Sequence, residues 1–157
     1  MNELEHTLVV IKPLKPGDRL PKVEEFVREW LESAGFNCLY RQQMRLTQEQ
    51  AVDLYEDTRG KWYHAKPIVF ILSGEIIAMV WSGEDAISTV KKLVGPTSVD
   101  AALESDSIRG DLLRRYGCAL PPYRDTANFV HAPGTTEEFK SQMDAVFGPE
   151  FAAKLSR

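Results

Sequence analysis

The sequence predicts an α+β protein built on a small, mostly antiparallel sheet. Two observations support this class. Short apolar segments rich in β-branched residues alternate with segments whose apolar residues recur at helical spacing. The candidate elements follow the order βαβ, then helices, then βαβα, with no internal repeat or low-complexity tract. We therefore expect residues 1–157 to form one domain, since this is an ordinary size for a compact unit.

The first βαβ unit is predicted over residues 7–46. TLVVIK (7–12) is β-branched and ends before Pro13, which is typical of a short buried strand. Apolar residues then recur at helical spacing over 23–31, and Gly35 predicts the end of that helix. NCLYRQQMRL (37–46) is the second strand candidate.

Two helices are predicted between the second and third strands. Thr47 and Gln50 have the spacing of a capping box, which predicts a helix that runs through Tyr55. The segment KWYHAKPIVFIL (61–72) predicts another short helix, with Pro67 acceptable only in its first turn.

The third strand, EIIAMVW (75–81), is the clearest in the chain. SGED after it (82–85) predicts a turn into a helix over 84–94. A loop and a short basic helix around 108–116 follow, and CALPPYRDTA (118–127) is predicted to be a loop stiffened by two prolines.

The last unit combines a short strand, NFVH (128–131), with a helix over 135–147. Thr135 and Glu138 form a second capping-box pattern at the start of this helix. His131 would then stand at a strand end, close to a helix N-terminus whose unpaired N–H groups favour phosphate or carboxylate.

Composition narrows the function classes. The net charge of −4 offers no positive surplus for broad nucleic-acid binding, although basic residues gather over 91–115. There is no apolar run of membrane-spanning length and no basic-then-apolar leader, so we expect a cytoplasmic protein that does not bind membranes.

His131 is the strongest candidate for chemistry. A neutral imidazole is a competent nucleophile near pH 7, so its position suggests phosphoryl transfer through a phosphohistidine. The alternative is a histidine that packs at a sheet edge. His6 and His64 do not complete a metal site by spacing, and the usual glycine-rich phosphate loops are absent from the sequence. Any nucleotide would therefore be bound by side chains.

Five motifs, in order, resemble the nucleoside diphosphate kinase family from Thr7 to about Phe147. They are TLVVIKP (7–13), SGEIIAMVWSGEDA (73–86), VGPTS (94–98), SIRGD (107–111) and NFVHAPGTTEE (128–138). The resemblance implies a ferredoxin-like βαββαβ sandwich whose four-stranded antiparallel sheet is covered by helices. It also implies transfer of the γ-phosphoryl group of a nucleoside triphosphate to a nucleoside diphosphate, by a ping-pong mechanism through the histidine of N-x-x-H.

The resemblance assigns roles position by position. His131 matches the phosphorylated histidine, and Gln142 falls where the family has the glutamate that orients its ring. Lys12 matches a lysine that contacts the ribose hydroxyl and the phosphates, and Asn128 matches an asparagine that shares the ribose contact.

The same comparison implies further contacts to the nucleotide. Tyr55 matches a tyrosine near the histidine, and Tyr63 falls where a phenylalanine stacks on the base. Thr97 and Arg109 match residues that contact phosphates. Taken singly, each of these side chains has an ordinary structural interpretation, as a core aromatic, a strand-end lysine or a surface ion pair.

The sequence also departs from the family pattern. Pro133 replaces a serine two residues after the histidine, and Gln142 lacks the charge of a glutamate. Lys91 replaces an arginine, with Lys92 as the alternative match; lysine keeps the charge but not the bidentate fork. The turn PLKPGDRLP and the loop 118–127 are longer than the common form.

The implied cofactor is Mg²⁺, which typically binds substrate phosphates and keeps several waters, so no protein metal ligands are expected. The implied partners are nucleoside tri- and diphosphates and further copies of the chain, in a dimer-based tetramer or hexamer. Two other functions stay open. The chain would be a nucleotide-binding regulatory or scaffolding module with weak or lost transfer, or an unrelated ferredoxin-like binding domain.

Overall fold

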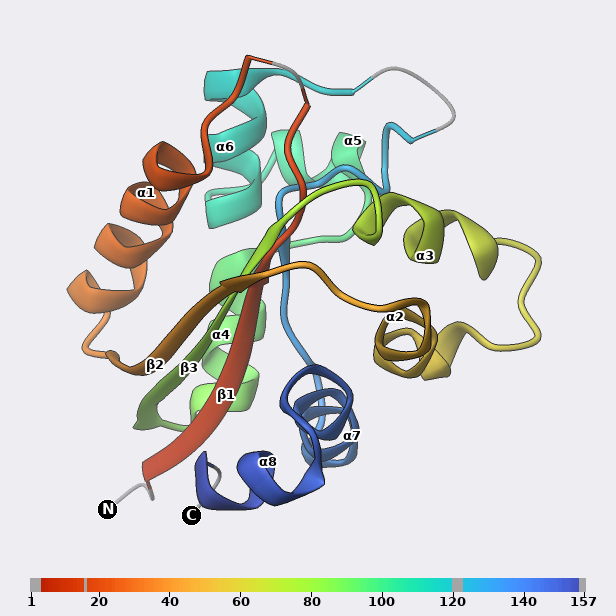
Figure 1. Ribbon diagram of the computed structural model, residues 1–157. Helices are drawn as coiled ribbons and strands as arrows, with labels where there is room; N and C mark the ends of the chain where they lie inside the picture. The colour runs from red at the N-terminus through yellow and green to blue at the C-terminus, as the bar shows by residue number, and fades with distance from the viewer. Residues whose placement is uncertain (1–3, 16, 120–122, 156–157) are drawn as a thin grey trace.

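The fold is a four-stranded antiparallel sheet with helices on both faces (Figure 1). The computed structural model describes residues 4–15, 17–119 and 123–155. The strands are β1 (Leu4–Ile11), β2 (Asn37–Met44), β3 (Ile76–Glu84) and β4 (Val130–His131), in the order β2-β3-β1-β4. The helices are α1 (Leu20–Ser33), α2 (Gln48–Leu54), α3 (Ala65–Ile71), α4 (Ala86–Val94), α5 (Val99–Leu103), α6 (Ile108–Tyr116), α7 (Thr136–Phe147) and α8 (Pro149–Leu155), with a 3-10 helix at Glu56–Thr58. This strand order, with α1 and α4 as crossovers, confirms the predicted ferredoxin-like fold.

The sheet separates two apolar clusters. Val9 and Ile11 of β1 face α1, α4, α5 and α6, whereas Leu8 and Val10 face α2, α3, α7 and α8 (Figure 1). The alternation follows from the two-residue period of a strand. The segments of these strands that are covered on both faces, LVVI in β1 and IIAMVW in β3, are continuously apolar.

The turn predicted at SGED (82–85) lies later than expected. β3 continues through Glu84, which pairs with Leu4 at the beginning of β1, so both strands extend beyond their predicted ends. Asp85 then adopts a left-handed conformation, with φ 48°, and α4 begins at Ala86. The polar residues 82–84 are compatible with a strand here because backbone pairing with β1 holds them in the sheet.

The predicted strand NFVH is shorter than expected. Only Val130 and His131 pair with β1, opposite Ile11 and Val10. Phe129 has a positive φ of 72°, which bends the chain away from an extended path. The bend turns Asn128 toward Lys12 and Thr97, with which its side chain forms hydrogen bonds. Residues 128 and 129 therefore do not pair with β1, and the Asn128 side chain forms hydrogen bonds where the prediction expected the strand to begin.

Two helices, α5 and α8, were not predicted. α5 has five residues inside a segment read as a loop. α8 begins at Pro149, directly after α7 ends at Gly148 in a left-handed conformation. It packs the Phe151 ring edge-on against Tyr40 of β2, with centroids 5.1 Å apart. Within the described ranges, no helix combines the length and apolar character needed to span a bilayer.

Candidate active site

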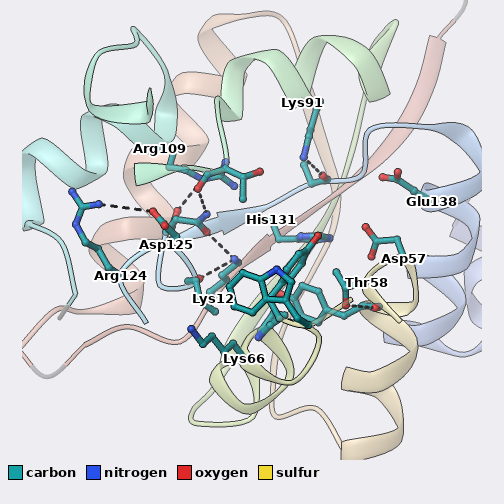
Figure 2. A pocket seen from close by; sticks show the side chains of 18 residues that line it. Lys12, Asp57, Thr58, Lys66, Lys91, Arg109, Arg124, Asp125, His131 and Glu138 are labelled. Atoms are coloured by element: carbon teal, nitrogen blue, oxygen red, sulfur yellow. Dashed lines mark hydrogen bonds and ion pairs between the residues drawn. The ribbon is translucent and has the colours of Figure 1, made fainter. Parts of the chain in front are cut away.

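A cavity of about 640 Å³ opens beside the end of β4. Helices α3, α4 and α6 contribute to its walls. The end of β1, the segment between α2 and α3, the turn after α4 and the loop before β4 also contribute. It brings together eight of the nine predicted site residues: Lys12, Tyr55, Tyr63, Lys91, Thr97, Arg109, Asn128 and His131. The ninth, Gln142, lies behind His131. Figure 2 shows His131 in the middle of the site, with Lys12 and Arg109 on one side and Asp57 and Glu138 on the other.

Within the described ranges, one side-chain hydrogen bond holds His131. Its Nε2 lies 2.9 Å from Oε1 of Gln142, which is 3% exposed on α7. An amide oxygen only accepts, so Nε2 carries the proton and Nδ1 keeps a free lone pair. The Tyr55 ring packs edge-on against the imidazole, with centroids 5.5 Å apart.

The surroundings of His131 favour its neutral form. Burial, followed by the charge of Lys12, lowers the pKa of His131 to about 3, with smaller contributions from Lys91 and Arg109. The hydrogen bond to Gln142 opposes this effect. A neutral ring with a free Nδ1 is the state that a nucleophile requires.

Lys12 and Asn128 form a connected pair at the floor of the cavity. Nζ of Lys12 donates to Oδ1 of Asn128 at 2.7 Å and to the Thr126 carbonyl at 3.0 Å. Nδ2 of Asn128 donates to the Thr97 carbonyl at 2.9 Å. Burial, then Arg109 and Lys91, keeps the pKa of Lys12 well below its ordinary value. The bonds position a cation that has only neutral acceptors.

Lys91 is the cation on the opposite wall. Its Nζ donates to the Ala132 carbonyl at 3.1 Å, next to His131. Burial and Arg109 lower its pKa, while Glu138 and Asp57 partly oppose the shift. Lys92 is exposed and does not line the cavity, so the geometry selects Lys91 of the two matches.

Arg109 directs its guanidinium at the backbone. Its nitrogens donate to the carbonyls of Gly95 and Pro96 at 2.8 and 2.6 Å and to Asn128 at 3.1 Å. A fourth bond goes to the Val130 carbonyl. Burial lowers its pKa to about 10, and the side chain is 2% exposed. Arg109 therefore adds charge to the cavity while it ties the turn after α4 to the segment leading into β4.

Three carboxylates, those of Asp57, Asp125 and Glu138, also line the cavity. Oε2 of Glu138 accepts from the Gly134 N–H at 2.9 Å. The described residues contain no group of three or more His, Cys, Asp or Glu side chains placed to hold a metal ion. The same cavity is lined by five basic side chains, those of Lys12, Lys66, Lys91, Arg109 and Arg124.

One prediction about the surroundings of the site was wrong, and only two of the basic residues over 91–115, Lys91 and Arg109, line the cavity. Of the basic residues at 91–115, Arg114 pairs with Asp111 and Arg115 lies over the Phe26 ring at 4.8 Å, so neither lines the cavity. The wrong prediction is the capping box of α7, which is incomplete. Thr135 accepts from the Glu138 N–H at 3.1 Å, but the Glu138 carboxylate bonds Gly134 instead of Thr135. These two N–H groups already have partners and are not free for a phosphate.

The loop 118–127 has a part in the site that its sequence did not indicate. Beyond residues 120–122, which lie outside the described ranges, residues 123–127 form a turn that borders the cavity. Oδ1 of Asp125 accepts from the Val99 N–H at 2.9 Å, and the Thr126 carbonyl accepts from Lys12. Proline and charged residues alone do not reveal such long-range bonds.

Further lining residues were missed between α2 and α3. Asp57, Thr58, Trp62 and Lys66 all border the cavity. Pro133, by contrast, is buried and not part of its lining. The apolar pattern of the sequence predicts helix α3. It does not predict which polar side chains near that helix line the cavity.

Comparison with known proteins agrees with this geometry. The family model for nucleoside diphosphate kinase matches residues 5–151. A nucleoside diphosphate kinase from Methanococcus maripaludis is 36% identical over 145 residues, covering 92% of this chain and 99% of that protein. The enzyme from Aquifex aeolicus superposes with a TM-score of 0.72 at 26% identity, covering 92% and 96% of the two chains. The Encephalitozoon cuniculi structure supports the fold, with a TM-score of 0.76 at 23% identity over 92% and 89%. The chain therefore belongs to the nucleoside diphosphate kinase family of phosphotransferases.

Proposed function

We propose that this chain transfers the γ-phosphoryl group of a nucleoside triphosphate to a nucleoside diphosphate, with His131 as the phosphorylated intermediate. The observation that carries the proposal is the state of His131. Its Nε2 is bonded to Gln142, its Nδ1 has no hydrogen-bond partner among the described residues, and it faces a cavity that Lys12, Lys91 and Arg109 help to line. Phosphoryl transfer depends mainly on positioning and on neutralising charge, which such a site supplies.

In the first half-reaction, the Nδ1 lone pair attacks the γ-phosphorus. The bond from the γ-phosphorus to the β,γ-bridging oxygen breaks, and the nucleoside diphosphate leaves with that electron pair. Oε1 of Gln142 keeps accepting the hydrogen bond from Nε2–H while the ring gains positive charge. In the second half-reaction, a terminal oxygen of another nucleoside diphosphate attacks the phosphorus, the N–P bond breaks, and neutral His131 returns.

The other residues bind and position the nucleotide in this proposal. Lys12, Lys91 and Arg109 offset the charge of the polyphosphate. The Tyr55 hydroxyl is buried, has no hydrogen-bond partner among the described residues, and borders the cavity. Burial raises the pKa of Tyr55, so the hydroxyl stays protonated and able to donate to a phosphate oxygen.

Asn128, Thr97 and Tyr63 would contact the nucleoside and the phosphates, as their positions in the cavity allow. Mg²⁺, bound to the substrate phosphates near Asp57 and Glu138, would further neutralise the polyphosphate charge.

The test is a phosphoenzyme assay. Incubation with Mg·ATP labelled at the γ-phosphate should give an acid-labile, alkali-stable label on the protein, and addition of a nucleoside diphosphate should remove it. His131→Ala should abolish the label. His64→Asn is the matched control, because His64 bonds Thr58 and does not line the cavity, and it should label normally. No label on the unaltered chain at saturating Mg·ATP would sink the proposal.

A second candidate is a nucleotide-binding module with weak or lost transfer, acting in regulation or as a scaffold. Two observations favour it. Gln142 brings no negative charge to His131, and the Arg109 guanidinium donates hydrogen bonds to backbone carbonyls instead of leaving its N–H groups for a phosphate. Nucleotide-induced thermal stabilisation without phosphate exchange would support this candidate instead.

We also expect a cytoplasmic homo-oligomer, a dimer-based tetramer or hexamer. Both cysteines, Cys38 and Cys118, are free, in keeping with a reducing compartment. β2 lies at the edge of the sheet, where Leu39 is 50% exposed, and such an edge favours contact with another chain. Light scattering on the purified protein measures the assembly.

A further inference from the structure

Trp62 is exposed in a way that the other tryptophans are not. Its side chain is 87% exposed, although it borders the cavity, whereas Trp81 is fully buried and Trp30 packs against the core. An indole is among the largest apolar surfaces a residue offers, and one left open to water at the mouth of a cavity indicates a binding role.

Trp62 and Tyr63 are consecutive residues whose ring planes are nearly perpendicular. Their centroids lie 5.5 Å apart and their planes meet at 89°. A flat ring stacked on one of them therefore meets the other edge-on, and the two cannot stack on the same face of a base. Tyr63 is half-buried, so the larger open π-surface belongs to Trp62.

A lysine accompanies the indole. Nζ of Lys66 lies 5.5 Å from the Trp62 ring centroid, and Lys66 also borders the cavity, as Figure 2 shows. The ammonium therefore lies beside the indole, on the border of the same cavity. An aromatic ring beside a cation is the combination that binds the base and the backbone of a nucleotide together.

We propose that Trp62 is the base-stacking residue of this chain, in addition to or in place of Tyr63. The inference rests on the proposed function for the identity of the ligand, a nucleotide whose phosphates reach His131. Stacking on an indole accepts every base, since each has a π-face, and favours purines through their larger overlap.

The test measures the binding of three ligands to the full-length protein with Mg²⁺ by calorimetry: ADP, UDP and inorganic pyrophosphate. Trp62→Ala should weaken ADP binding roughly 5- to 150-fold, as expected for the loss of one base–aromatic stack. UDP should lose less. Pyrophosphate, which has no base, should bind within about twofold of the unaltered protein. Trp62→Phe should recover part of the loss.

Fluorescence gives an independent reading. Since Trp62 is the exposed tryptophan, ADP should quench the emission of the unaltered protein and of Trp30→Phe, but not of Trp62→Phe. Tyr63→Ala supplies the matched comparison and should weaken ADP binding less than Trp62→Ala.

Three results would overturn the inference. The first is an ADP affinity in Trp62→Ala equal to that of the unaltered protein. The second is a loss of pyrophosphate affinity as large as the loss of ADP affinity. The third is a substitution that changes only self-association in light scattering. The last result would assign the indole to contact with a second copy of the chain. If ADP binding behaves as expected but no phosphoenzyme forms, the transfer proposal fails while the stacking role stands.

Discussion

At the scale of single residues, the site depends on how His131 is oriented. Gln142 is buried on α7 and bonds Nε2, so the helix sets the direction in which Nδ1 faces the cavity. Gln142 acts through the histidine and is therefore a positioning residue. A glutamine does this without adding a charge, so burial, followed by the nearby Lys12, determines the protonation of the ring.

We predict that Gln142→Leu lowers kcat roughly 100-fold, because a nucleophile that is no longer held in line loses about this much. Gln142→Glu should keep most of the activity. Its carboxylate should raise the pKa of His131 from about 3, so the acid limb of the rate profile should move to higher pH. The pH dependence of kcat in both variants checks this. An acid limb that stays in place in Gln142→Glu would contradict the orientation assigned to Nε2.

At the scale of secondary-structure elements, α5 and α6 are joined by close backbone contact. Gly110, in the first turn of α6, faces the carbonyl oxygens of Ala102 and Ser105, and a Cβ at this position would lie too close to both. The contact seats α6 against α5 and thereby positions Arg109, the residue before Gly110. The SIRGD motif thus combines a packing glycine with a cavity-lining arginine.

We predict that Gly110→Ala destabilises the protein by about 1–3 kcal/mol, the usual cost of overpacking, although alanine is the better helix former. Urea unfolding gives the free energy. Gly134→Ala is the matched control, because a Cβ there meets only the Glu138 and Lys91 side chains at 3.6 Å or more. Equal stability of the two variants would exclude the backbone contact as a constraint.

The elements also show where prediction from the sequence reached its limit. The short apolar runs of β1 and β3 and the helical spacing of apolar residues in α1 predicted the type of each element, because burial in the core requires these patterns. The bend at Phe129 and the short α5 were missed, since they depend on bonds between residues distant in sequence, such as Asn128 with Thr97. Of the site, the residues in motifs were predicted. Trp62, Lys66 and residues 123–126 were not, because no local pattern records which side chains share a cavity.

At the scale of the whole molecule, the low pKa of His131 links the site to stability. The folded ring has a pKa of about 3, whereas an unfolded histidine has one near 6.5. Between these values the unfolded chain binds a proton that the folded chain does not. Stability from this group is therefore highest above pH 6.5 and falls as the pH decreases toward 3.

We predict that His131→Asn loses less stability than the unaltered protein when the pH drops from 7 to 4.5, by up to about 2–3 kcal/mol. Urea unfolding at the two pH values measures the difference. The other titrating groups are common to both chains and cancel in the comparison. An identical loss in both proteins would show that His131 is readily protonated in the folded state.

Three of the cations that line the cavity are bonded to uncharged oxygens. Lys12, Lys91 and Arg109 donate to carbonyls and to one amide, and no ion pair involves them within the described ranges. A bound anion would serve as their counter-ion and relieve the repulsion among them, which would stabilise the folded chain. The ligand is in this sense a structural component of the protein. A cell short of such anions would hold this chain in its less stable form, and the lifetime of the protein would then follow the supply of its own ligand.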